Sequence, residues 1–484
     1  MNFLWLVVTG THSLTYSLTH LLTHSPTVLV TTISCSSGAV ASSDVRPVDN
    51  NSHYEILLDA GSTGTRIYIY GYHIDDPILS LVEVAHRREI PALSSFYNNA
   101  IGLQNQMNIL LEFAKAHVPN ELWSNSTIAL KATAGLRSIP VHEQDWLLVE
   151  VKQLLNETGF NFVNEDTKVI EGEEEALYDL MAIMAASYSK KFLIYGLNGE
   201  EELVAADLGG SSQQVAFFSN NDDCVPDWKI ELPISINEKT GPFYIFAKSI
   251  SKLGLIAAMD RTLETYYSEN RSNSTEVDVS GDISQTYHPC IPPGEFPSDG
   301  LPVAMEAYTP IHGSGDYHRC KELVRQVLVP PAKDILSSSC INRMKSRAMT
   351  FIGMDNFPKA LEVLSLSNYS SINPFAVDQA GVAICQRPWR DVLNDHPPGF
   401  QPYRAQRSCF AAAFISVFLT DIFGIDTQEK YFLPLDNIKG TSFNAEEIDG
   451  IGERGEHVHT MELSWTLGAA FLAASGARKE RIYK

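Results

Sequence analysis

Two acidic, glycine-rich loops contain the residues of this sequence whose types and spacing could bind and cleave a phosphate. They read DAGSTGTR at residues 59–66 and DLGGSSQQ at residues 207–214, and each follows an apolar run. Glycine and small hydroxyl residues let backbone N–H groups approach a phosphate closely, and carboxylates suit Mg²⁺ or Ca²⁺. One such loop alone is equally consistent with a turn capped by its aspartate. Two of them indicate a phosphate site with a divalent cation.

A third acidic segment, EGEEEALY at residues 171–178, supplies a further candidate for catalysis. Carboxylates are favoured at the start of a helix, which accounts for most of this run. One of its four glutamates could act as the general base on an attacking water if the run lies between two lobes. Their spacing does not choose among the four.

The elements around the two loops form a repeat. Residues 54–58 and 67–72 are predicted strands beside the first loop, and residues 202–206 and 215–218 beside the second. Strand, glycine-rich turn and strand make a β-hairpin, not the strand-to-helix turn of a P-loop. The hairpins lie about 150 residues apart, the length of one domain. We therefore predict two similar lobes whose loops face each other across a cleft.

The other segments are predicted from periodicity and composition. Helices are expected at residues 104–116 and 145–156, a strand at 127–131, and a final helix at 460–476 that packs on the first lobe. Residues 268–297 are expected to form a polar surface insertion, and residues 444–455 a mobile loop.

Size and charge limit the classes of function. A chain of 484 residues with 44% hydrophobic and 19% charged residues is expected to form two or three globular domains. Its net charge of −22 excludes a general nucleic-acid binder, which needs a basic surface. An acidic protein can still bind phosphates where a metal ion and backbone N–H groups supply the positive field.

The N-terminal residues have the features of a targeting segment. Residues 1–41 contain no Lys, Arg, Asp or Glu, carry apolar runs, and finish with AVA at 39–41, which fits a cleavage site. We predict a signal peptide over residues 1–41. The alternatives are an uncleaved membrane anchor or a start upstream of the true Met. The apolar run at 409–423 is broken by Asp421 and is predicted to be a buried helix, so we expect no membrane span after signal cleavage.

Sequons and cysteines agree with entry into the secretory pathway. N-glycosylation sequons begin at Asn50, Asn125, Asn156, Asn270, Asn273 and Asn368. The six cysteines beyond residue 41 have no C-x-x-C spacing, which argues against zinc and for disulfides. We expect a secreted protein or one of the ER or Golgi lumen.

Five motifs, in order, resemble the conserved regions of the ecto-apyrase or nucleoside triphosphate diphosphohydrolase family. They are DAGSTGTR (59–66), KATAGLR (131–137), EGEEEALY (171–178), DLGGSSQQ (207–214) and WTLGAAF (465–471). LKATAGLRSIP is most similar to the soluble secretory-pathway branch, whose members prefer nucleoside diphosphates. The resemblance implies an α/β, two-lobed actin-like or RNase H-like fold, with mixed sheets flanked by helices. Lobe I would be residues 52–172 plus 460–484, and lobe II residues 173–459.

The resemblance also implies a role for each matching residue. Glu175 matches the general base, with Ser212 and Gln214 orienting the attacking water. Asp59 and Asp207 would hold Ca²⁺ or Mg²⁺ through its water ligands. The implied phosphate contacts are Ser62, Thr63, Gly64, Thr65, Arg66, Thr133, Gly209, Gly210 and Ser211. The implied disulfides are Cys290–Cys320 and Cys385–Cys409, with Cys224–Cys340 as the remaining pair.

These roles predict an enzyme that hydrolyses the terminal phosphate of nucleoside di- or triphosphates, preferring diphosphates such as UDP or GDP. Ala176 and Leu180 depart from the Gly and Trp usual in the family, as do Ile250 and Met259 from its Tyr and Arg. The last two departures leave the nucleobase preference open. The alternatives are an exopolyphosphatase or a sugar kinase on the same fold, or a catalytically silent nucleotide-binding protein.

Overall fold

The computed structural model describes residues 51–73, 79–188, 202–219, 223–232, 242–273, 287–296, 311–346, 349–366, 372–425, 431–435, 437–439 and 460–482. Contacts gather Val48–Lys484 into one compact unit. The predicted signal peptide, the sequons at Asn50 and Asn368, the side chains of Asn270 and Asn273, and the predicted loop 444–455 lie outside the described residues.

Two mixed sheets provide the framework. The first contains β1 (Ser52–Gly61), β2 (Gly64–His73), β3 (Val82–Glu89), β4 (Thr127–Ala132), β5 (Asn161–Phe162) and β6 (Lys168–Val169). The second contains β7 (Glu202–Leu208), β8 (Ser212–Phe218), β9 (Trp228–Glu231), β10 (Phe243–Ser251), β14 (Met349–Asp355), β15 (Tyr431–Pro434) and β18 (Arg478–Arg481).

The two sheets share one strand order. The first reads β3-β2-β1-β4-β5, and the second contains β10-β8-β7-β14-β15, continued beyond β10 by β9 and β18. In each sheet an antiparallel hairpin carries a third antiparallel strand on one side and two parallel strands on the other. The repeated topology confirms the prediction of a two-lobed α/β fold whose lobes are alike.

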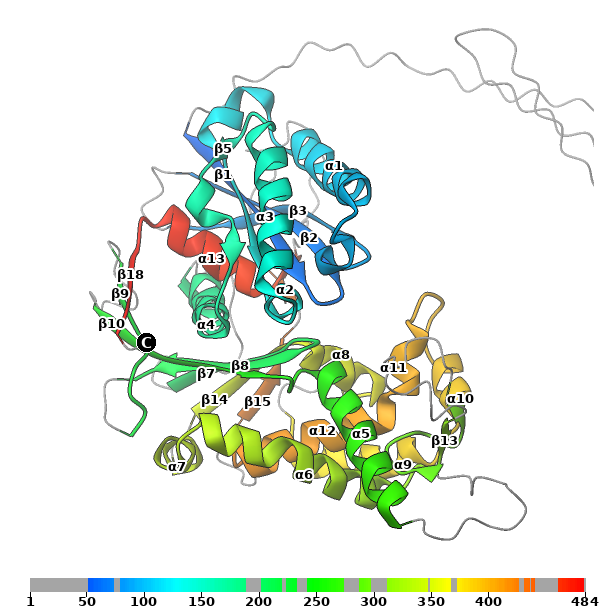
Figure 1. Ribbon diagram of the computed structural model, residues 1–484. Helices are drawn as coiled ribbons and strands as arrows, with labels where there is room; N and C mark the ends of the chain where they lie inside the picture. The colour runs from blue at the N-terminus through cyan, green and yellow to red at the C-terminus, as the bar shows by residue number, and fades with distance from the viewer. Residues whose placement is uncertain are drawn as a thin grey trace, which may run out of the picture. The chain divides into compact units, whose positions relative to one another are not determined.

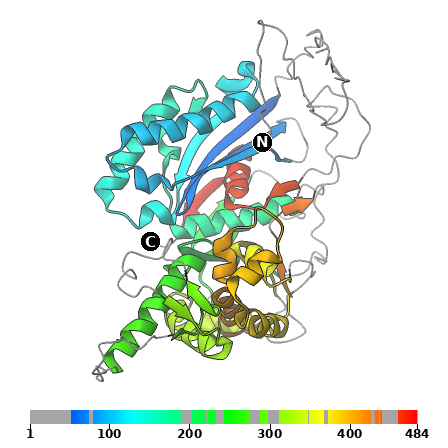
Figure 2. The same ribbon diagram turned by 90° about the vertical axis from the view of Figure 1, so that its right-hand side faces the viewer.

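Helices cover both outer faces of the sheets and fill the space between them (Figures 1 and 2). On the first sheet the outer helices are α1 (Ala100–His117) and α3 (Val141–Asn156). On the second they are α5 (Leu255–Asn273), α6 (Tyr317–Ile335), α8 (Asn356–Val363) and α12 (Ser408–Val417). Between the sheets lie α4 (Gly172–Tyr188) and α13 (Trp465–Ala474).

Among the described residues there are five further α-helices and two small sheets. The helices are α2 (Ala134–Arg137), α7 (Ser338–Ser346), α9 (Pro374–Cys385), α10 (Trp389–Asn394) and α11 (Pro402–Gln406). A three-stranded sheet contains β11 (Tyr287–His288), β12 (Gly294–Phe296) and β13 (Ile311–Gly313). Strands β16 (Asn437–Lys439) and β17 (Thr460–Glu462) form a separate pair.

Strand alternation aims the two loop aspartates at the central helices. Leu57 of β1 and Ala205 of β7 belong to the core around α4 and α13, while their neighbours in each strand pack on the outer helices. Side chains two residues apart in a strand point to the same face. Asp59 and Asp207, two residues further on, therefore face the central layer from opposite sheets.

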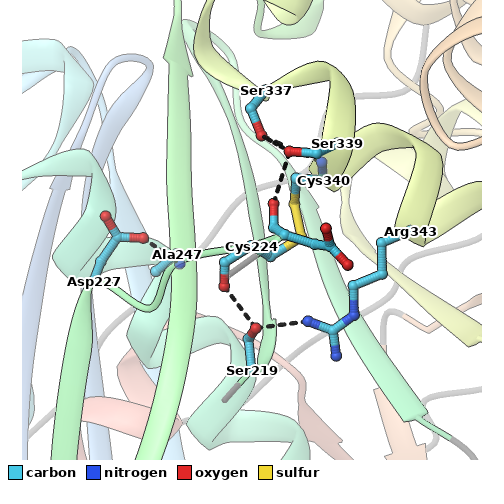
Figure 3. The surroundings of a disulfide bond; sticks show 9 residues. Ser219, Cys224, Asp227, Ala247, Ser337, Ser339, Cys340 and Arg343 are labelled. Carbon is cyan, nitrogen blue, oxygen red and sulfur yellow. Dashed lines mark hydrogen bonds between the residues drawn. A yellow bond between two sulfur atoms is a disulfide. The ribbon is translucent and has the colours of Figure 1, made fainter. Parts of the chain in front are cut away.

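The predicted disulfides and the buried helix are confirmed. The bonds Cys224–Cys340, Cys290–Cys320 and Cys385–Cys409 are all present. At the first of them, Arg343 donates to the Ser219 hydroxyl at 2.6 Å and that hydroxyl donates to the Cys224 carbonyl at 2.6 Å (Figure 3). The run at 409–423 forms α12 and the turn that follows it, and α12 is buried throughout. No helix in the described part of the chain has the length and apolar character needed to span a membrane.

Two sequence predictions need correction. Residues 268–297 are not simply a surface insertion, because His288, Cys290 and Ile291 are buried and Cys290 is bonded to Cys320. The final helix begins at Trp465 and not at residue 460, because residues 460–462 form β17 and the Ser464 side chain caps the helix by accepting from the Thr466 N–H.

The lobe boundaries predicted from the sequence stay predictions. Helix α13 packs against α4 and the first sheet. Strand β18, only a few residues later, pairs with β9 at the edge of the second sheet. Residues 460–482 therefore contact both sheets, although residues 460–484 were assigned to lobe I.

The close packing of α13 on α4 generates a stability prediction. A side chain at Gly468 would overlap the Tyr178 carbonyl oxygen and lie 2.6 Å from the Ala182 nitrogen. Because backbone atoms cannot yield as a flexible side chain can, we expect Gly468→Val to lower the free energy of unfolding by about 3 kcal/mol. Ala473→Val, at an exposed position of the same helix, is the control. Equal thermal midpoints for the two variants would contradict this account.

Candidate active site

The two loops line one cleft between the sheets. The cleft has a volume of about 930 Å³ and is lined by both hairpins, α4 and α8. A methyl group added at Gly210 of the second loop would lie 2.8 Å from Oγ of Ser62 in the first. The loops therefore approach each other closely, as the repeat predicted.

The two loop aspartates are buried at the floor of this cleft. Asp59 lies opposite Arg66 in the β1–β2 register and accepts from its Nη1 at 3.2 Å. Its other oxygen, Oδ1, is buried without a hydrogen-bond partner among the described residues. Burial raises the pKa of Asp59 to about 7 against the opposing effect of Arg66. Burial, then Asp355 and Glu175, likewise raise the pKa of Asp207 well above its usual range.

Glu175 lies in the cleft near the start of α4, held by two donors. Arg137 donates from Nη2 to Glu175 Oε2 at 2.7 Å, and Gln214 donates from Nε2 to the same oxygen at 3.2 Å. The Ser212 hydroxyl accepts from Gln214 at 2.7 Å and from Arg137 at 3.4 Å. Burial raises the pKa of Glu175, while Arg137 opposes that rise. The carboxyl is thus fixed in position but not strongly stabilised as an anion.

The structure distinguishes the four glutamates that the sequence could not. Glu174 turns away from the cleft and pairs with Lys168 at 3.0 Å and with Lys479. Glu171 pairs with Arg481, whose guanidinium also lies 3.8 Å from Glu173. Of the run, Glu175 alone lines the cleft.

Most of the residues predicted for the site line this cleft. They are Asp59, Ser62, Thr63, Arg66, Thr133, Glu175, Asp207, Gly209, Gly210, Ser211 and Ser212. Gln214 stands behind them as a partner of Glu175. Gly64 and Thr65 do not line the cleft: Thr65 is fully buried inside β2, because alternation turns its side chain into the protein.

Charged residues that the sequence reasoning missed complete the cleft wall. Asp355 lies at the end of β14, one residue after Met354, which pairs with Asp207 of β7. Oδ1 of Asp355 accepts from Nζ of Lys359 at 2.7 Å. Burial alone would raise the pKa of Asp355, but Lys359 and Arg66 outweigh burial and lower it. No motif marks these residues, and only the parallel pairing of β7 with β14 brings Asp355 to the loop.

Arg88 of β3 fastens the tip of the first loop. Its Nη2 donates to the Thr63 carbonyl at 2.9 Å and to the Thr63 hydroxyl at 3.0 Å. The conformation of the first loop therefore depends on a strand outside its own hairpin.

Tyr403 and Arg407 also line the cleft and form a cation–π pair at 5.7 Å.

The residues on the cleft floor are suited to a divalent cation that keeps its water ligands. The orphaned Oδ1 of Asp59 and the carboxylate of Asp207 offer hard oxygen acceptors. Among the described residues, no three His, Cys, Asp or Glu side chains come together closely enough to ligate a metal directly. An ion held through its waters is compatible with that spacing.

Comparison of the chain with known proteins identifies one family. The model of the GDA1/CD39 (nucleoside phosphatase) family matches residues 45–482. Probable apyrase 3 of Arabidopsis thaliana is 27% identical, over 87% of this chain and 82% of that protein. A guanosine-diphosphatase of Candida albicans is 26% identical, over 87% of this chain and 70% of that protein.

A solved structure shares the fold. The nucleoside triphosphate hydrolase structure from Neospora caninum superposes with a TM-score of 0.56 at 14% identity, covering 87% of this chain and 92% of that one. At this identity the likeness concerns the fold alone, and it agrees with the two-lobed architecture.

Arg88 provides a test of the loop geometry. Arg88→Met removes both hydrogen bonds to Thr63, so we expect about tenfold weaker binding of orthovanadate, a phosphate analogue, in calorimetric titration. Arg87→Met is the matched control, since Arg87 is the adjacent residue of β3 and pairs with Glu89. Equal affinities in the two variants would show that Arg88 does not order the loop.

Proposed function

This chain belongs to the GDA1/CD39 nucleoside phosphatase family, and we propose that it hydrolyses the terminal phosphate of nucleoside diphosphates, with Glu175 as general base. The observation that carries the proposal is the position of Glu175. It lies in the cleft that both loops line, with its carboxyl held by Arg137 and Gln214. Relatives named apyrase and guanosine-diphosphatase support the nucleotide substrate and the diphosphate preference.

The proposed reaction transfers a phosphoryl group to water. Glu175 accepts a proton from a water that the Ser212 hydroxyl helps to orient, and the water oxygen attacks the terminal phosphorus. The bond from that phosphorus to the bridging oxygen breaks, which releases orthophosphate and a nucleoside monophosphate. A carboxylate whose pKa is raised by burial is a stronger base than an ordinary one, which suits proton transfer near neutral pH.

Positioning and charge neutralisation contribute most of the remaining catalysis in such reactions. The backbone around Ser62, Thr63 and Gly210 is proposed to bind the terminal phosphate, with Arg66 beside it. Bound Ca²⁺ or Mg²⁺, held by Asp59 and Asp207 through its waters, would supply further positive charge. Tyr403 and Arg407, which also line the cleft, are proposed to offer a flat, cationic surface for the nucleoside.

We also infer that the chain passes through the secretory pathway. Three disulfides are typical of oxidising compartments. The sequon residues Asn125 and Asn156 are both exposed, as attachment of a glycan requires. These features support secretion or residence in the ER or Golgi lumen.

A substrate panel tests the proposed activity. With Ca²⁺ or Mg²⁺, the purified protein should release phosphate from UDP or GDP faster than from ADP or ATP and should leave AMP intact. EDTA should abolish the release, because the cation offsets the charge of the phosphates. Absence of phosphate release from every di- and triphosphate would instead support a catalytically silent nucleotide-binding protein.

The base assignment has its own test. Glu175→Gln should fold and bind nucleotide but lose about 10²–10⁴-fold in kcat, because the amide cannot accept the proton. Glu173→Gln, in the same first turn of α4, should keep most of the activity, since Glu173 is directed to Arg481. Comparable kcat values for Glu175→Gln and the unmodified protein would refute Glu175 as the base.

A further inference from the structure

Asp179 is a buried acidic residue that the reaction proposed above does not use. It lies on α4, one helical turn beyond Glu175 and therefore on the same side of the helix. It is 1% exposed, and neither carboxyl oxygen has a hydrogen-bond partner among the described residues. Burying a carboxyl without a partner is costly, so such a group calls for a ligand that the polypeptide does not provide.

The surroundings of Asp179 are acidic. After burial, the groups that raise its pKa most are Asp207, Glu175 and Asp355, all three in the cleft wall. Asp207 faces the central layer that contains α4, as the alternation along β7 requires. Asp179 thus lies behind the cleft lining, on the face of α4 that carries Glu175 and close enough to Asp207 for the two carboxyls to influence each other.

Three other carboxylates at this junction each form an ion pair. Asp59 pairs with Arg66, Glu175 with Arg137, and Asp355 with Lys359. Glu174, on the other side of α4, pairs with two lysines. For Asp179 the structure gives no ion pair within the described ranges, and the charged groups that raise its pKa are all carboxylates.

We propose that Asp179 is a third carboxylate of the divalent-cation site and accepts hydrogen bonds from the water shell of the ion that Asp59 and Asp207 hold. The inference rests on the cation of the proposed function. Oδ1 of Asp59, which lines the cleft, is a further buried carboxyl oxygen without a hydrogen-bond partner among the described residues, as expected for a group that faces the water shell of a cation. Asp179 touches no substrate in this scheme, so it is a positioning residue that strengthens binding of the ion.

The competing account is that Asp179 is a neutral carboxyl packed in the core. The two accounts differ in what an uncharged isostere does. In the outer shell of a metal site, loss of a hydrogen-bonding partner typically weakens metal binding 10–100-fold. A neutral packed group can be exchanged for an amide of the same shape without any effect on the ion.

The test is calorimetric titration of the full chain with Ca²⁺, and separately with Mg²⁺, in the presence of an α,β-methylene nucleoside diphosphate that cannot be hydrolysed there. We expect Asp179→Asn to bind the ion about 10–100-fold more weakly, with an unchanged or higher thermal midpoint without metal. Glu55→Gln is the matched control, because Glu55 is also a buried carboxyl but is bonded to Thr127 and Tyr72 in the first sheet. It should bind the ion like the unmodified protein.

The outcomes separate this inference from the proposed function. If the unmodified protein binds neither ion, the cation-dependent function and this inference both fail. If it binds the ion and Asp179→Asn binds within twofold of it, only this inference is overturned. Should Asp179→Asn not fold, Asp179→Ala, which is smaller and equally uncharged, takes its place, and unaltered affinity there overturns the inference in the same way.

Discussion

Acidic side chains gathered where the two sheets meet are the constraint that the rest of the structure accommodates. Asp59, Glu175 and Asp207 are buried at this junction and Asp355 is half-buried beside them, and burial of a carboxylate without a cation or hydrogen bond is costly. The cations come from separate elements: Arg66 from β2, Arg137 from α2 and Lys359 from α8. The pairs of Asp59 and Asp355 form between residues close in sequence, whereas the Arg137–Glu175 pair joins α2 to the central helix α4, which links this part of the site to the assembled fold.

The sequence was sufficient for the architecture because its signals are local. Each hairpin reads as apolar strand, glycine-rich turn and apolar strand, and the alternation within β1 and β7 alone decides that Asp59 and Asp207 face inward. Strand β18 has no such signal: its residues 478–481 (RKER) are polar and mostly exposed, and it is a strand only because β9 pairs with it. The burial of His288 and Cys290 could likewise not be predicted from the polar composition of their segment. The disulfide from Cys290 to Cys320 holds this part of the chain in the interior.

The residues of the site likewise fall into those with a local sequence signal and those without one. Residues of the two loops could be predicted because the chemistry of phosphate binding restricts their types. Asp355 could not, because it reaches the cleft through pairing of strands distant in sequence, and Arg88 could not, because it lies on β3, outside both motif hairpins. Thr65, which the motif assigns to the phosphate contacts, is fully buried, so its side chain does not line the cleft. The motifs identify the segments that form the site, and the strand register determines which side chains line the cleft.

Neighbouring glutamates on α4 explain how the helix can be both anchored and reactive. Successive helical residues point about 100° apart, so Glu174 and Glu175 meet different surroundings. Burial would raise the pKa of Glu174, but Lys479, Tyr178 and Lys168 outweigh it and lower the pKa to about 2. Lys479 belongs to β18 of the second sheet and Lys168 to β6 of the first. The Glu174 carboxylate therefore connects both sheets to the start of α4.

The two pKa shifts have opposite consequences on acidification. Glu174, with its pKa lowered to about 2 in the folded state, contributes stability that is present above its unfolded value and is lost only as the pH falls through about 2. Glu175, with its pKa raised, takes up a proton at a higher pH than an ordinary glutamate. The ion pairs of Glu174, which fix the start of α4, therefore persist at pH values at which Glu175 is already protonated. Within a single turn, the same residue type gives the helix its anchor and the cleft its proton acceptor.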